Sequence, residues 1–68
     1  MNEIIFIVEE ADEGGFIAKA LGENIFTQSE TMEELKVMIK DAVRCHFDTN
    51  NLPKIIRLHF VKEEIITI

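Results

Sequence analysis

The chain has 68 residues and a formal net charge of -6, with thirteen acidic and seven basic side chains. A chain of this length forms one small domain over residues 1–68, and it buries only about 60% of the surface that it exposes when unfolded. Its acidity disfavours binding to a phosphate backbone, and its 47% hydrophobic content argues against a disordered chain. Cys45 is the only cysteine, so disulfides within the chain cannot stabilise the domain. Self-association is the remaining way for so small a domain to gain stability. A single thiol and the lack of a secretory leader predict a cytoplasmic protein.

The first predicted element is a β-strand from Ile4 to Val8, a continuous run of β-branched and aromatic residues. Both faces of this strand are apolar. An antiparallel sheet with one wet face would show alternation instead, so the face that carries Ile5 and Ile7 is expected to contact another subunit. These two residues are therefore candidates for self-association.

A cluster of four acidic residues follows this strand, formed by Glu9, Glu10, Asp12 and Glu13. The cluster lacks the regularly spaced oxygen ligands and the closing glutamate of an EF-hand loop, so no calcium site is predicted. Two interpretations remain open. The cluster is either a solvated turn or an electrostatic docking site for a basic protein.

Two short strands complete a predicted antiparallel meander. Gly14 and Gly15 can adopt the positive φ values of a tight turn, so Phe16 to Ala20 is predicted to return as the second strand of a hairpin. After a second turn, residues 24–28 form the third strand.

An amphipathic helix is predicted next. Thr31 followed by Glu34 fits a capping box, in which the hydroxyl accepts from the third helical amide and the glutamate reaches back to the cap amide. Apolar side chains then recur at helical spacing and form one stripe to pack on the sheet: Met32, Leu35, Met38, Ile39, Ala42, Val43 and Phe47.

The chain closes with a fourth strand over residues 55–61 and a second apolar run at its end. Ile56, Leu58 and Phe60 alternate with polar residues. The final run contains Ile65, Ile66 and Ile68, and such strand-forming residues make a sticky edge unless they are paired. We expect them to pair within the fold or with a second copy.

No catalytic residue, cofactor site or metal site is predicted. Cys45 and His46 are neighbours on a helix and point about 100° apart, so they cannot form a nucleophile and base pair. His46 is expected to be partly buried against a carbonyl or the helix end. An enzymatic alternative is a minimal hydrolase that would use Asp12, Glu13 and His59.

The stretch from Gly14 to Leu35 resembles the core signature of the HicB-like antitoxin domain. A glycine-glycine-aromatic strand, a threonine-glutamine strand end and a threonine-capped helix start follow one another at the spacing of that family. The matching residues are Gly14, Gly15, Phe16, Ala18, Thr27, Gln28, Thr31, Glu33, Glu34 and Leu35.

This resemblance implies a β-β-β-α-β topology and a partner of the HicA type, a small basic toxin that cleaves mRNA. The antitoxin domain would mask the cleaving surface of the toxin, and the acidic charge of the chain agrees with that role. HicB antitoxins usually append a helix-turn-helix or ribbon-helix-helix segment that binds operator DNA. The sequence stops at Ile68, so direct DNA binding is not expected.

The sequence thus predicts an α+β domain with a twisted antiparallel sheet and one helix on one face. We expect it to form a homodimer or a higher even oligomer. The leading function is non-enzymatic protein binding as an antitoxin. The alternatives are a homodimeric domain of the same family with an unrelated ligand or partner, and the minimal hydrolase.

Overall fold

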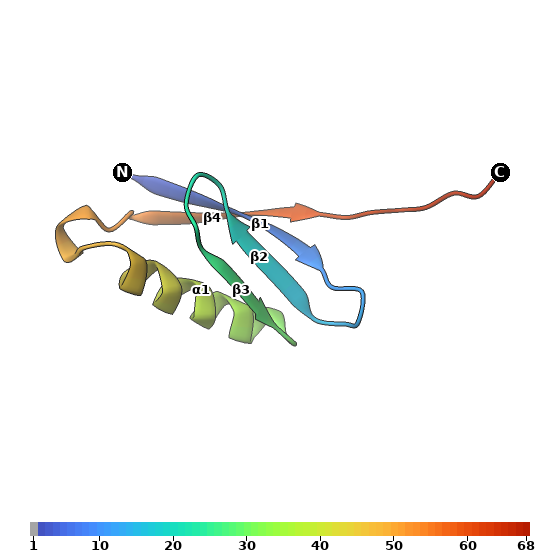
Figure 1. Cartoon of the computed structure of the whole chain (residues 1–68), viewed down its shortest axis with the longest axis horizontal. Helices are drawn as coiled ribbons and strands as arrows, with labels where there is room; N and C mark the ends of the chain where they lie inside the picture. Colours follow the sequence, from blue (N-terminus) through green and yellow to red (C-terminus); the bar gives the residue numbers. More distant parts are fainter. Residues whose placement is uncertain (1) are drawn as a thin grey trace.

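The computed structural model describes residues 2–68 and shows one four-stranded sheet with a helix on one of its faces (Figure 1). Its strands lie side by side in the order β3-β2-β1-β4. The elements in chain order are β1 (Glu3–Glu10), β2 (Phe16–Ala20), β3 (Phe26–Ser29), α1 (Met32–His46), the short 3₁₀ helix η1 (Thr49–Asn51) and β4 (Ile55–Val61). The α+β prediction and the predicted order of elements are confirmed.

The first three strands form the predicted antiparallel meander, but the sheet as a whole is mixed. β4 pairs with β1 in parallel, from Glu3 opposite Ile55 to Glu9 opposite Val61. The expectation of a wholly antiparallel sheet was therefore wrong for this strand. α1 and η1 carry the chain back to the start of β1, where the amides of Lys54 and Ile55 donate to the carbonyl of Asn2 at 2.9 and 3.1 Å.

The core lies between α1 and one face of the sheet. Successive strand residues point to opposite faces, so alternate residues of β1 are buried beneath the helix. Phe6 and Leu35 have no exposed surface. The buried apolar residues are Ile4, Phe6, Val8, Ala18, Ile25, Leu35, Ile39 and Val43.

The predicted helix cap is half formed. Thr31 Oγ1 accepts a hydrogen bond from the amide of Glu34 at 3.2 Å. The carboxylate of Glu34, however, accepts from Ser29 Oγ at 3.2 Å, so this side chain ties the helix to the end of β3. The cap prediction is confirmed for the threonine.

Replacing Thr31 with alanine should lower the free energy of unfolding by about 1 kcal/mol, because one amide of the first helical turn loses its acceptor. Urea denaturation followed by circular dichroism measures this loss. Thr31→Ser retains the hydroxyl and serves as the control. Equal losses in both variants would show that the hydroxyl does not stabilise the helix.

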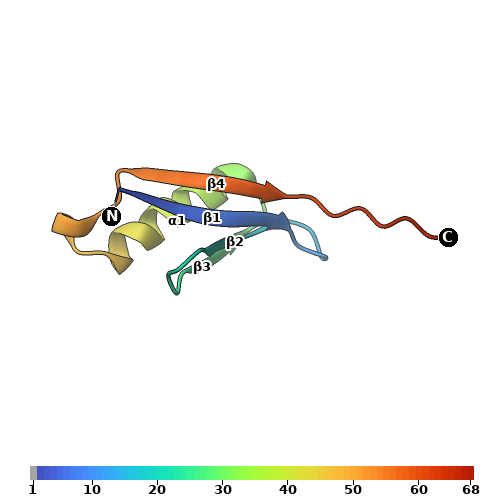
Figure 2. The ribbon, with the colours of Figure 1, turned by 90° about the horizontal axis from the view of Figure 1, so that it is seen from above.

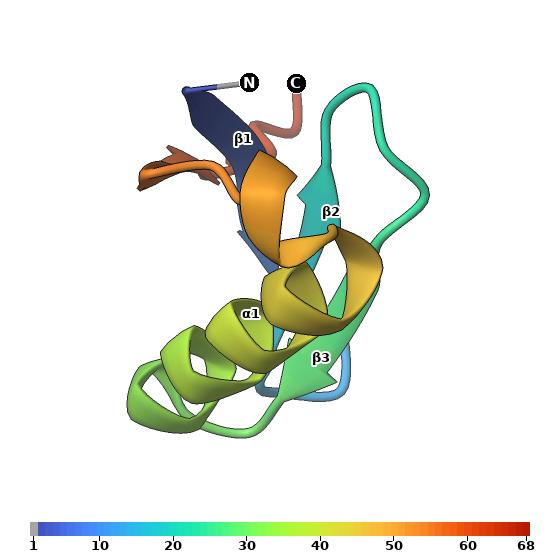
Figure 3. The same cartoon turned by 90° about the vertical axis from the view of Figure 1, so that its left-hand side faces the viewer.

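α1 covers the sheet unevenly. It packs mainly on β3 and β2, and the helix lies across these strands in Figure 3. Ile56 and Leu58 of β4 are only half-buried, and Phe60 on the same face is 63% exposed. One end of the β4 edge therefore keeps an uncovered apolar surface.

Residues 62–68, which we call the tail, continue beyond β4 without forming a strand in this chain. Figures 1 and 2 show the tail running away from the sheet, and the molecule measures 52 × 21 × 17 Å as a result. Of the two predicted pairings of Ile65 to Ile68, the one within the fold is not formed, and pairing with a second copy stays a prediction. Within residues 2–68, no helix has the length and apolar character needed to span a membrane.

Candidate protein-interaction site

The acidic turn lies between two grooves at the end of the sheet where β1 stops. Ala11 donates its amide to the carbonyl of Gly15, and Gly14 donates to the carbonyl of Ala11, both at 3.0 Å. These bonds close the hairpin and fix the backbone of Asp12 and Glu13, whose side chains are exposed. The turn is thus an ordered projection that carries negative charge.

The first groove, which we call the hairpin–tail groove, separates the hairpin from the end of β4. β1 bends into the hairpin after Glu10, whereas the chain beyond Val61 runs straight on, so the two strands diverge. The groove has a volume of about 500 Å³. Its lining residues are Val8, Glu9, Glu10, Ala11, Asp12, Phe16, Phe60, Val61, Lys62, Glu63 and Ile65.

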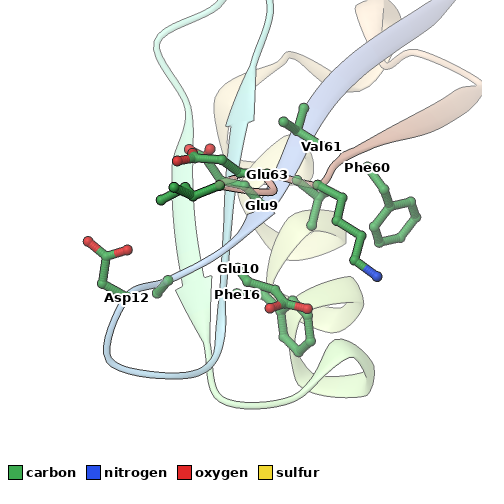
Figure 4. Close-up of a pocket in the computed structure, with 11 residues that line it drawn as sticks. Glu9, Glu10, Asp12, Phe16, Phe60, Val61 and Glu63 are labelled. Atoms are coloured by element: carbon green, nitrogen blue, oxygen red, sulfur yellow. The ribbon is translucent and has the colours of Figure 1, made fainter. Parts of the chain in front are cut away.

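Acidic and apolar side chains lie next to one another along this groove. Glu10 lies opposite Phe16 in the β1–β2 ladder, and Glu9 lies opposite Val61 in the β1–β4 ladder. Figure 4 shows Glu10 beside Phe16, with Phe60 projecting from β4 and Asp12 at the turn. A ligand in the groove would meet apolar rings and carboxylates together.

The second groove, which we call the hairpin–helix groove, lies between the same turn and the start of α1. It has a volume of about 620 Å³. Met38, which is 41% exposed, provides part of its apolar surface. The lining residues are Ala11, Asp12, Glu13, Gly14, Phe16, Gln28, Ser29, Glu30, Glu34 and Met38.

The two grooves share Ala11, Asp12 and Phe16, so they form one continuous acidic end of the molecule. Lys62 is the only basic residue that lines either groove. We call the following seven carboxylates the acidic end: Glu9, Glu10, Asp12, Glu13, Glu30, Glu34 and Glu63. More than half of the thirteen acidic residues of the chain therefore line this end.

The sequence prediction located four of these carboxylates and missed three. Glu30, Glu34 and Glu63 are distant from the turn in sequence and reach it through strand pairing and the helix start. The sequence contained one signal for this arrangement, the glycine at position 15. The structure gives its reason: a Cβ on this residue would lie 2.6 Å from the carbonyl oxygen of Ser29. A glycine required by such a close approach places the end of β3 against the turn.

The residues predicted for self-association lie on two separate surfaces. Ile5 and Ile7 are half-buried on the face of the sheet opposite α1, where Arg57 and His59 lie across from them on β4. The tail isoleucines project away from the sheet, with Ile65 and Ile66 81% and 83% exposed. The structure therefore does not unite them into one patch.

An ion pair borders the sheet face that carries Ile5. Arg57 Nε donates to Glu3 Oε1 at 3.1 Å, and a terminal guanidinium nitrogen donates to Oε2 at 3.0 Å. These hydrogen bonds lower the pKa of Glu3 and raise the pKa of Arg57. The Glu3–Arg57 pair therefore places one negative and one positive charge side by side at this border of the sheet face.

The histidines do not join the acidic end. His59 lies opposite Ile7 in the middle of the β1–β4 ladder and lines neither groove, so the structure does not bring it into a groove with Asp12 and Glu13. His46 lies in the last turn of α1, at the helix end named as one of its two expected surroundings, but it is exposed and not partly buried, and its Nε2 lies 3.4 Å from Glu23 Oε1. Among residues 2–68, no cluster of three or more histidine, cysteine or acidic side chains is arranged to hold a metal ion.

Two curated proteins are similar to this chain over most of its length, and each is described as a UPF0150 protein. The relative from Thermotoga maritima is 50% identical over 67 residues, which cover 98% of this chain and 94% of that protein. The relative from Archaeoglobus fulgidus is 56% identical over 55 residues, which cover 81% of this chain and 82% of that protein. No protein-family model and no solved structure matches the chain.

Proposed function

We propose that this chain, which belongs to the UPF0150 family, is a non-enzymatic protein-binding module whose acidic end binds a basic protein. The observation that carries the proposal is the gathering of seven carboxylates around two grooves with exposed aromatic and methionine side chains. The resemblance of Gly14 to Leu35 to the HicB-like domain suggests the class of partner: a small, basic, mRNA-cleaving toxin of the HicA type.

The composition of the acidic end suits a partner that is rich in lysine and arginine. Opposite charges increase the rate of encounter and select against acidic partners. The long stems of lysine and arginine can pack on Phe16 and Phe60, and a guanidinium over an aromatic ring gains a cation–π interaction. The grooves can therefore bind both the charged head and the apolar stem of one side chain.

Such binding would also inhibit a ribonuclease. An RNA-cleaving surface binds phosphates through basic side chains, and carboxylates placed against the same side chains compete with the phosphates. The mechanism that we propose is occlusion and needs no catalytic group from this chain. A homodimeric module with a partner unrelated to toxins is the alternative. The minimal hydrolase is less favoured, because neither of the two described grooves is lined by Asp12, Glu13 and His59 together.

The test begins with co-purification of the tagged chain from its native cell. We expect a small basic protein, encoded beside this chain and containing a histidine, that cleaves RNA and is inhibited by the chain. The dissociation constant of the purified pair should rise at least tenfold when Glu10, Asp12 and Glu13 are changed together to Gln, Asn and Gln, because three opposite charges are lost.

A matched control removes the same number of charges elsewhere. Glu33→Gln, Asp41→Asn and Asp48→Asn lie on exposed positions outside both grooves, and their combination should change the dissociation constant by less than threefold. Equal weakening in the two triple variants would assign the effect to net charge and contradict a localised site. Absence of a basic partner would contradict the toxin-binding proposal.

A further inference from the structure

The outer edge of β4 and the tail that continues beyond it together form one long unpaired edge. β4 pairs with β1 through one edge, and its other edge has no partner within residues 2–68. Ile66 of the tail is 83% exposed and Ile68 is fully exposed. Exposed apolar strands with free backbone groups are templates for pairing with another chain.

The molecule exposes more surface than a compact monomer of its size. Its accessible surface is 5519 Å², whereas a compact protein of 7.8 kDa exposes about 4,400 Å². Its radius of gyration is 13.4 Å, compared with about 11 Å for a compact domain of 68 residues. The excess of about 1,100 Å² exceeds the roughly 800 Å² that each partner buries in a standard interface.

We propose that the occupant of this edge is a second copy of the chain, with the tail of each copy paired antiparallel to β4 of the other. The tail is long enough to pair with most of β4, because β4 spans seven residues and residues 62–68 follow it. β4 contains no acidic residue, so antiparallel pairing with the tail places neither Glu63 nor Glu64 opposite another carboxylate. The result is one eight-stranded sheet with both helices on the same face.

The symmetry of this pairing restricts its register. Two antiparallel edge strands are related by a two-fold axis perpendicular to the sheet, so residues of the helix-covered face lie opposite residues of that same face. The residue at the axis then lies opposite the same residue of the other copy. Registers that pair most of the tail with β4 place Phe60, Val61 or Lys62 at the axis. Lys62 is excluded because it would place like charges opposite each other.

The side-chain pairs favour Val61 at the axis. In that register, Ile56 lies opposite Ile66 on the helix-covered face, and His59 lies opposite Glu63 on the other face. Aliphatic pairs of this kind stabilise antiparallel sheets, and an imidazole N–H of His59 can donate a hydrogen bond to the carboxylate of Glu63. The aromatic ring of Phe60 would lie opposite the aliphatic stem of Lys62.

The register centred on Phe60 is worse on the helix-covered face. It places two charged side chains opposite residues that are half-buried against the core, Glu64 opposite Ile56 and Lys62 opposite Leu58, whereas the register centred on Val61 places one, Glu64 opposite Leu58. A charged side chain at such a position loses hydration without gaining a partner.

Disulfide cross-linking tests this register. The native cysteine is first replaced, Cys45→Ser, and Val61→Cys is then introduced. Directly opposite residues have Cβ atoms about 4.5–5.5 Å apart, close enough for a disulfide, whereas residues offset by two positions are too distant. We expect nearly complete dimer on a non-reducing gel after mild oxidation, and little dimer from Lys62→Cys. Preferential linking through position 62 or position 60 would overturn the proposed register.

Sedimentation tests the dimer itself. The unmodified chain should sediment as a dimer at micromolar concentration, and Ile66→Lys should raise the dimer dissociation constant at least tenfold. Ile66 is exposed in the single chain, so this variant should keep the circular dichroism spectrum of the fold. Val37→Lys is the matched control, because Val37 is 59% exposed on α1, and it should remain dimeric. A monomeric unmodified chain at 100 μM or above would overturn the proposal.

Discussion

Replacing Phe6 with alanine is expected to lower the free energy of unfolding by about 3–5 kcal/mol, enough to unfold a large part of the protein at 25 °C. Phe6 is completely buried in the central strand. It lies opposite Ala20 on one side and Leu58 on the other. A domain of this size is stable by about 3–10 kcal/mol in total, so one large cavity removes much of its stability.

Urea denaturation measures this effect. The chain contains neither tryptophan nor tyrosine, so circular dichroism is a better probe than intrinsic fluorescence. Wild type and variant must be compared at one protein concentration, because association stabilises the folded state. Phe26→Ala is the control, since Phe26 is 55% exposed on β3 and should cost about 1 kcal/mol or less. Similar losses in both variants would place the core elsewhere.

The second large effect is expected at Gly15. Its φ of +83° alone makes Gly15→Ala unfavourable by about 1–2 kcal/mol. The new methyl group would also lie 2.6 Å from the carbonyl oxygen of Ser29, a backbone atom that cannot rotate away. Such overpacking adds typically about 1–3 kcal/mol, so the total loss should be about 2–5 kcal/mol.

Gly14 provides a matched control in the same turn. Its φ of +99° is equally unusual for a residue with a side chain, but a Cβ there would meet nothing within 4 Å. Gly14→Ala should therefore lose only the backbone contribution of about 1–2 kcal/mol. Thermal or urea unfolding of both variants separates the two causes. Identical losses would show that the contact with Ser29 does not constrain the fold.

The elements that depend on local patterns could be predicted from the sequence. The capping threonine, the apolar stripe of the helix and the alternation along residues 55–61 are properties of neighbouring residues. β1 extends beyond its apolar run to Glu3 and Glu10. Both of its edges are paired, and the pairing with β2 and β4 includes these polar residues at its ends. Strand pairing thus decides the ends of an element.

The acidic end could be predicted only in part, because it combines distant segments. The turn carboxylates are adjacent in sequence, but Glu30 and Glu63 reach them through β3 and the tail. The parallel direction of β4 was also hidden, since it depends on how far α1 and η1 carry the chain back along the sheet. That distance cannot be inferred from any short stretch of the sequence.

The pairing of Glu3 with Ile55 has a consequence for the time course of folding. The meander and α1 form from segments close in sequence, whereas closing the β1–β4 ladder requires a loop that contains nearly the whole chain. Longer loops cost more entropy to close, so β4 is expected to join the sheet last. During synthesis the partly folded chain then has β1 with one edge open, and the same late strand must find that edge. If β4 pairs slowly, it can pair with the open edge of β1 in a neighbouring nascent chain, so that two copies exchange this strand. If β4 pairs rapidly, each copy folds by itself before it associates with another.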